Sequence, residues 1–267
     1  MKLVFYYPKD KTLKEYIQGY YFMSEGEKAD SFRYYTFPNN YNIISVNQNA
    51  KVEFEGNKFI VSPTSDKNII ADLVNTYSKP IEVIYKQPTN EITIYFKPMG
   101  ILHFLNNSEI FNQQIFENFD PFTDFKVEME SIFDLPNRET QIEHLENYWL
   151  SKFQKRDLSL MEKIVSDIEE NMKVQEIAEK YNLTRQYVNK LFLKFTGKPA
   201  SQYRKIHRFR NAISRYKKSK NLTVLSYDSF FFDQSHFIKD FKTLTDINPI
   251  SFFKTIDTEN ENIWLIF

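Results

Sequence analysis

Residues 174–192 read VQEIAEKYNLTRQYVNKLF, and this stretch decides the fold of the C-terminal part of the chain. Its apolar residues recur at helical spacing on both sides of a break at residues 181–183, which predicts two short helices joined by a sharp turn. Ala178 is small enough for the helices to cross closely, and Asn182 tolerates the left-handed backbone that ends a helix. Thr184 is placed to cap the second helix. This pattern is typical of a helix-turn-helix, whose second helix enters the major groove of DNA.

The polar face of the predicted second helix carries side chains that can donate hydrogen bonds to DNA. Gln and Asn can read adenine with two hydrogen bonds, and Lys can donate to guanine. The alternative is an ordinary exposed amphipathic helix. We expect base readout by Arg185, Gln186, Tyr187, Asn189 and Lys190.

The distribution of charge favours DNA over that alternative. The 267 residues carry no net charge, yet residues 1–150 hold 14 basic and 21 acidic side chains, and the remainder holds 21 basic and 14 acidic ones. Residues 180–220 contain thirteen Lys or Arg and no Asp or Glu. A solvated surface usually mixes the two signs, so a basic module for a polyanion is the better interpretation.

The pattern of two short helices separated by a break occurs again about fifty residues further on, at residues 222–242. Gln234, Ser235 and Lys239 take the places of the exposed readers in this second unit. A helix of about fifteen residues would join the two units, which could then read successive major-groove segments ~34 Å apart.

Residues 160–255 resemble the DNA-binding domain of AraC/XylS-type bacterial transcription regulators. The resemblance rests on IAEKYNLTRQYVNKLF, FTGKPASQYRKIHRFRNA and FFDQSHFIKDFKTLTDINPISFF. It implies two helix-turn-helix units bridged by a linker helix that contains Tyr203, Arg208, Phe209 and Ala212. The acidic first half resembles the cupin-like sensor domains found ahead of such modules. Phosphate contacts are expected from Thr184, Lys194, Arg204, Lys205, His236 and Lys242.

Three residues of the second unit depart from the family pattern. Ser226 and Phe230 stand where the family usually has Ala and Gly, and Asp246 also replaces a usual Gly. Phe is poorly suited to a left-handed turn. The second unit is therefore expected to be built or docked differently from the first.

The first hundred residues read as short strands separated by Pro-, Gly- and Asn-containing turns. Helical patterns follow from about residue 100, and an apolar stripe at residues 139–153 would either pack on its own domain or form a dimer seam. The predicted fold class is α+β. It comprises a mainly β, cupin-like domain with trailing helices (1–138), a helical linker (139–157) and an all-α DNA-binding domain (158–267). The expected strands are residues 32–37, 41–46, 52–54, 59–61, 81–85 and 91–96.

Composition excludes several classes of function. The chain has no cysteine and only five glycines, so it lacks disulfides, thiolate chemistry and glycine-rich phosphate loops. Its four histidines do not form a metal cluster in the sequence, and His103 is expected to be a core or surface residue. We expect no catalytic residue, metal or cofactor. No apolar stretch is long enough for a membrane span, which predicts a cytoplasmic protein.

The function favoured by these observations is a one-component, sequence-specific transcription regulator that binds double-stranded DNA. A small-molecule effector and a homodimer are left open, RNA polymerase is a partner if the protein is an activator, and the effector-binding residues are unknown. The alternatives are a cupin-like enzyme that binds or modifies a small molecule and carries a basic appendage, and a general nucleic-acid- or partner-binding protein.

Overall fold

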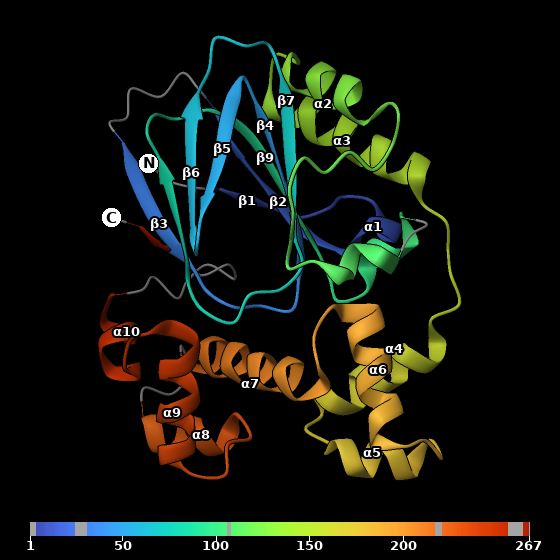
Figure 1. Cartoon of the computed structure of the whole chain (residues 1–267), viewed down its shortest axis with the longest axis vertical. Coiled ribbons are helices and arrows are strands. Elements are labelled where there is room, and N and C mark those ends of the chain that lie inside the picture. The colour runs from blue at the N-terminus through green and yellow to red at the C-terminus, as the bar shows by residue number, and fades with distance from the viewer. Residues whose placement is uncertain (1–3, 25–30, 106–107, 217–220, 256–263, 267) are drawn as a thin grey trace. The chain divides into compact units, whose positions relative to one another are not determined.

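The computed structural model describes residues 4–24, 31–105, 108–216 and 221–255, together with the backbone of residues 264–266. The chain forms two compact units (Figure 1). The first comprises residues 1–33, 41–75 and 83–157, and the second comprises residues 34–40, 76–82 and 158–267. Two short segments from the first hundred residues therefore belong to the mainly helical second unit.

The strands form two sheets. The six-stranded sheet has the order β1-β2-β9-β4-β7-β10, and the five-stranded sheet has the order β11-β3-β8-β6-β5. Each of the six predicted strands is present. The strand bounds are β1 Phe5–Tyr6, β2 Ile17–Met23, β3 Phe32–Thr36, β4 Asn42–Gln48, β5 Ala50–Glu55, β6 Lys58–Pro63, β7 Ile69–Val74, β8 Ile81–Tyr85, β9 Asn90–Phe96, β10 Ile115–Phe116 and β11 Trp264–Ile266.

Two long strands, β2 and β7, were not predicted from the sequence. Their side chains are almost all buried or half-buried, so polar and apolar residues do not alternate along them. A strand that is covered on both faces lacks the period of two by which strands are recognised. Both lie inside the six-stranded sheet, where β2 pairs with β9 and β7 pairs with β4.

Helices of the first unit pack with the six-stranded sheet (Figure 1). They are α1 Lys11–Tyr16, the short 3-10 helices η1 Gly100–His103 and η2 Ser108–Asn112, α2 Phe125–Phe133 and α3 Arg138–Lys152. The Trp149 ring of α3 is fully buried and lies 5.0 Å from the Phe96 ring of β9. The apolar stripe of α3 is thus buried within its own unit, which is the first of the two interpretations above.

A cluster of polar residues is buried on one face of the same sheet. Ser45 and Tyr21 each pair with Thr93 across the sheet, and Glu91 lies two residues before Thr93 on the same face. The Glu91 carboxylate is 1% exposed and accepts hydrogen bonds from the hydroxyls of Tyr21 (2.9 Å), Ser45 (2.5 Å), Thr93 (2.7 Å) and Tyr85. These donors satisfy a buried carboxylate, which would otherwise be costly.

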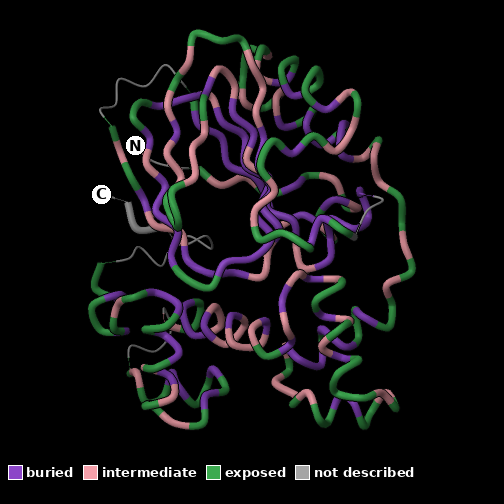
Figure 2. Tube along the Cα trace, viewed as in Figure 1, coloured by how far each residue is buried: buried purple, intermediate pink, exposed green. Residues whose placement is uncertain are grey.

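The second unit contains seven helices in its described part. Their bounds are α4 Ser159–Glu169, α5 Val174–Lys180, α6 Arg185–Thr196, α7 Ala200–Tyr216, α8 Leu222–Asp228, α9 Gln234–Thr245 and α10 Pro249–Thr255. The two predicted pairs, α5 with α6 and α8 with α9, are present, and α7 is the helix that joins them. Buried and exposed residues alternate along them in short runs (Figure 2), as expected for amphipathic helices that share one core. In the described part of the chain, no helix is both long and apolar enough to cross a membrane.

Candidate DNA-binding surface

The first helix-turn-helix consists of α5 and α6, with the turn that the sequence predicts. Asn182 takes a left-handed conformation with a φ of 52°, and the Leu183 amide donates to the Ala178 carbonyl at 2.8 Å. The Thr184 hydroxyl accepts the Tyr187 amide at 3.1 Å, which caps α6. Val188 is fully buried on the opposite face of α6. This face fixes α6 against the unit and leaves its first turn in solvent.

Most of the expected readers on α6 lie on that solvent side. Arg185, Gln186, Tyr187 and Lys190 are exposed, and the first turn of the helix holds no acidic residue. Asn189 differs because it is half-buried. Its side-chain nitrogen donates to the Arg185 carbonyl at 3.2 Å, and its oxygen accepts the Ala200 amide at 3.3 Å. Asn189 therefore ties α6 to the start of α7 in this structure.

The second helix-turn-helix, formed by α8 and α9, repeats these contacts in spite of its unusual residues. The Phe231 amide donates to the Ser226 carbonyl at 3.0 Å, as the Leu183 amide does to Ala178, and Asp233 caps α9 by accepting the His236 amide at 2.7 Å. Phe230 adopts the left-handed conformation with a φ of 64°. The expectation that Phe230 alters this unit is thus corrected, because Phe230 takes the left-handed conformation that Gly usually supplies.

The other two unusual residues, Ser226 and Asp246, also fit the fold of the second unit. Ser226 is fully buried where α8 meets its neighbours, and its hydroxyl donates to the Thr223 carbonyl at 2.8 Å. Asp246 ends α9 with a φ of 56°, as Gly197 ends α6 with a φ of 70°. A small residue at 226 keeps the close crossing, and its one polar atom is satisfied locally.

The expected readers of the second unit are also exposed. Gln234, Ser235 and Lys239 lie on the solvent side of α9, whereas Phe237 and Phe241 are fully buried. The Gln234 side-chain oxygen accepts the Thr223 hydroxyl at 3.2 Å, which links the first turn of α9 to α8. The first turn of α9 lacks acidic residues as well. The first turns of both recognition helices are therefore free of acidic residues, although the cap of α9 is the Asp233 carboxylate.

Lys205 and His236, which were expected to contact phosphate, instead lie with Arg208 around the buried carboxylate of Asp240. Asp240 of α9 is 4% exposed and lies within 3.1 Å of the Lys205 amine, 3.4 Å of the Arg208 guanidinium and 3.2 Å of the His236 ring. Lys205 and Arg208 belong to α7, so this cluster joins the linker helix to the second recognition helix. The family resemblance did not indicate this role for Lys205 and His236.

The remaining expected phosphate ligands fall into two groups. Lys194 and Lys242 are exposed near the C-terminal ends of α6 and α9, and Thr184 is exposed as the cap of α6. Arg204 is half-buried and donates to the Asn171 carbonyl at 2.9 Å and to its side-chain oxygen at 2.6 Å. The guanidinium of Arg204 thus holds the turn between α4 and α5.

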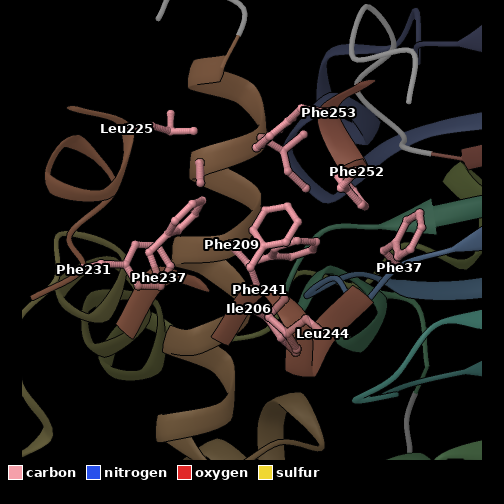
Figure 3. Packing of buried hydrophobic residues seen from close by; sticks show 12 residues of the cluster. Phe37, Ile206, Phe209, Leu225, Phe231, Phe237, Phe241, Leu244, Phe252 and Phe253 are labelled. Carbon is pink, nitrogen blue, oxygen red and sulfur yellow. The ribbon is translucent and has the colours of Figure 1, made fainter. Parts of the chain in front are cut away.

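The core of the second helix-turn-helix includes a residue from the first hundred (Figure 3). Phe37 is 1% exposed and packs edge-on against Phe252 of α10, with ring centroids 5.0 Å apart. The Arg210 guanidinium of α7 donates to the carbonyls of Phe37 at 2.7 Å and Pro38 at 2.9 Å. Sequence analysis missed this contact, because nothing in the pattern around residue 37 indicates which core it joins.

Lys198 is a further residue that the sequence did not single out. It follows the Gly197 cap of α6 and is fully buried. Burial disfavours the charged amine and lowers the pKa of Lys198 to about 7. One of the thirteen basic residues of the cationic stretch is therefore part of the core and does not add to the DNA-facing charge.

His103, one of the two histidines of the first unit, is a core residue, which is one of the two positions expected for it. His103 is 2% exposed, its Nδ1 atom accepts the Arg156 amide at 3.1 Å, and its ring lies 4.2 Å from that of Tyr16. Burial lowers the pKa of His103. In the ranges that the structure describes, no three His, Asp or Glu side chains are grouped so that they could hold a metal ion.

These features define a protein with two helix-turn-helix units. Residues 177–255 match the family model of a helix-turn-helix domain. Over these residues the AraC-type resemblance found in the sequence is confirmed. The chain thus carries a helix-turn-helix domain of the AraC type over residues 177–255, and the predicted α+β class is confirmed by the two sheets and by the helices of the second unit. Among curated protein sequences, none matches this chain.

Similar solved structures include several of ToxT from Vibrio cholerae. One is 17% identical over 88% of this chain and 96% of that chain, with a TM-score of 0.45. ToxT from Vibrio cholerae O395 bound to (E)-4-(8-methylnaphthalen-1-yl)but-3-enoic acid is 18% identical over 84% and 97%, with a TM-score of 0.47. Unsaturated fatty acid bound ToxT from strain SCE256 is 17% identical over 86% and 91%, with a TM-score of 0.46.

Proposed function

We propose that this protein is a one-component transcription regulator that binds double-stranded DNA with sequence specificity. The observation that carries the proposal is the pair of capped recognition helices, α6 and α9, whose exposed first turns hold donors and no acidic residue. A helix of this kind reads base edges with its N-terminal residues. The two helices would read successive major-groove segments.

Base readout is assigned to the exposed side chains of both helices. Gln186 can pair with adenine through two hydrogen bonds, and Gln234 can do so once its oxygen leaves the exposed Thr223 hydroxyl. Lys190 and Lys239 can donate to guanine. Asn189 is already bonded within the unit, so it would have to leave the Ala200 amide before it could read a base. We therefore place Gln186 ahead of Asn189 as a reader. The readers are Arg185, Gln186, Tyr187, Lys190, Gln234, Ser235 and Lys239, with Asn189 second to them.

Phosphate contacts are assigned first to exposed side chains and then to side chains that already bind another residue of the unit. Lys194, Lys242 and the Thr184 cap are exposed, and they can meet the DNA backbone without leaving a buried partner. Arg204, Lys205 and His236 would have to do so while they hold Asn171 or Asp240. The first group is expected to set the salt dependence of binding.

The first unit is proposed to control the second through an effector or by forming a homodimer. We keep residues 1–138 as the sensor-like domain, 139–157 as the linker and 158–267 as the DNA-binding domain. An effector can shift the protein between two states only if it binds them unequally. RNA polymerase would be a further partner of an activator, and no catalytic role is proposed.

The proposal is tested by selecting DNA that binds the full chain from a random double-stranded pool at near-physiological salt. The recovered sequence is then titrated against a scrambled version of itself. We expect a motif with two half-elements about one helical turn apart, and a preference of at least a thousandfold over scrambled DNA. Weak binding without enrichment that vanishes as salt is raised would contradict specific recognition.

Single substitutions then separate readout from backbone contact. Gln186→Ala should lower affinity for the selected motif by about tenfold and leave the dependence on salt unchanged, because one base contact is lost. Lys194→Ala should weaken motif and scrambled DNA alike and reduce the salt slope by about one. Gln175→Ala, on the helix that precedes the recognition helix, serves as the matched control. Equal effects of Gln186→Ala on both DNAs would remove Gln186 from the readers.

A further inference from the structure

The turn of the second helix-turn-helix is one residue longer than that of the first. In the first unit, the left-handed residue Asn182 is followed by Leu183 and then by the cap Thr184. In the second unit, Phe230 is followed by Phe231, by Phe232 and only then by the cap Asp233. Phe232 is therefore an extra residue directly in front of the recognition helix α9.

The neighbouring aromatic residue explains how this turn is held. Phe231 is 4% exposed, and its ring lies 5.1 Å from the Phe237 ring and 5.0 Å from the Arg208 guanidinium. Its position in the core is also visible in Figure 3. With Phe231 anchored inside, the next side chain along the extended turn points outwards. Phe232 is 85% exposed, the highest value of any large apolar residue in the described part of the chain.

An aromatic side chain at this place has no use in the fold that we can identify. At 85% exposure the Phe232 ring buries little of its surface in the free protein, so it adds little to the core. Two residues further on, Gln234 and Ser235 form the first turn of α9, which is the end of the helix that meets base edges. Phe232 is continuous with that surface. The major groove offers one apolar group to such a side chain, the 5-methyl group of thymine.

We propose that Phe232 is a specificity-determining residue that packs on a thymine methyl next to the base read by Gln234. This inference rests on the proposed DNA-binding function. It assigns to the second unit a preference for thymine that hydrogen-bond readout alone does not supply. The contact also removes an exposed ring from water, which gives the phenyl group a role only in the complex.

The test uses the full chain and the motif recovered by selection, in which each thymine in turn is replaced by deoxyuridine. This replacement removes one methyl group and keeps base pairing. We expect one thymine in the half-element read by α9 at which the replacement weakens binding of the unsubstituted protein about fourfold, the value of one buried methyl group. Phe232→Ser should bind the intact motif about four- to tenfold more weakly, and should be indifferent to deoxyuridine at that position.

Two further variants make the result specific to the apolar contact. Phe232→Leu keeps an apolar side chain and should retain the effect of deoxyuridine. Tyr227→Ser removes another exposed ring, 59% exposed on α8, and should leave the affinity and the deoxyuridine profile unchanged. Circular dichroism and the thermal midpoint confirm folding of each variant, which is expected because both positions are exposed.

The outcomes separate this inference from the function on which it rests. If no motif is selected, the proposed function fails before Phe232 is tested. If a motif is selected and Phe232→Ser binds it as tightly as the unsubstituted chain, with the same deoxyuridine profile, the inference is overturned and the function stands. A change in sedimentation for Phe232→Ser with unaltered DNA binding would overturn it too, because Phe232 would then meet a second copy of the chain.

Discussion

Replacing Lys198 by Met should stabilise the second unit and remove a pH dependence that is built into its core. The Lys198 amine is fully buried and its pKa falls from 10.5 to about 7. The unfolded chain therefore binds this proton more tightly than the folded one between pH 7 and 10.5. The free energy of unfolding must rise with pH across that window, and each unit of pKa difference contributes about 1.4 kcal/mol. The whole effect is on the order of 5 kcal/mol as an upper bound.

At pH 7 most of this penalty is still present. Met has a similar length and no charge, so Lys198→Met should raise the free energy of unfolding by up to about 4 kcal/mol at pH 7 and by much less near pH 10. Hydrogen exchange of α6 and α7 amides under native conditions reports the stability of the second unit separately from the first. Lys194→Met, at an exposed position on α6, is the matched control and should not change the pH slope.

Two results would refute this reasoning. Parallel stability curves for Lys198→Met and the unsubstituted chain between pH 6.5 and 9.5 would show that Lys198 keeps its charge in the folded state. Lower stability of Lys198→Met at every pH would show that the buried amine contributes favourable hydrogen bonds that Met cannot replace.

Three other substitutions test contacts of the second unit. Asp240→Asn leaves the half-buried Lys205 and Arg208 without their carboxylate, and should lower the free energy of unfolding by about 3 kcal/mol in urea denaturation. Phe37→Ala should cost about 3–4 kcal/mol and reduce exchange protection in α9 and α10 more than in α5 and α6, because Phe37 fills the core of the second helix-turn-helix only. Phe230→Gly should raise the thermal midpoint, because the left-handed conformation costs Phe about 1 kcal/mol and costs Gly almost nothing. A lower midpoint for Phe230→Gly would show that the packing of the ring outweighs the strain.

The cluster around Asp240 links structure and proposed function. It connects the linker helix α7 to the recognition helix α9 through three basic side chains of which two were expected on phosphates. If DNA phosphates compete with Asp240 for Lys205, binding of DNA loosens the contact that orients α9. The orientation of α9 is then coupled to the positive charge that the protein presents to DNA. Asp240→Asn therefore has a second readout, the dependence of DNA affinity on salt, which should steepen as Lys205 is released.

Local sequence patterns were enough to place the helices of the second unit. The spacing of Val188 and Phe192, the Thr184 cap and the left-handed Asn182 all act within one or two helical turns, so short-range rules predict them. The same holds for the exposure of Arg185, Gln186 and Lys190, because residues opposite a buried face must point to solvent. The return of the same pattern at residues 222–242 predicted the second unit and the helix that joins the two, and the family resemblance agreed with it.

Contacts between distant residues were decided only by the tertiary structure. The bonds from Arg210 to Phe37 and Pro38, the burial of Lys198 and the convergence on Asp240 join residues whose local patterns carry no sign of each other. At Phe230, tertiary contacts override a local conformational preference. Its intrinsic preference opposes a left-handed turn, yet the Phe231 anchor and the Asp233 cap on one side and α8 on the other impose it. The sequence by itself determined the two recognition helices, and tertiary packing determined which of their polar residues are left free for DNA.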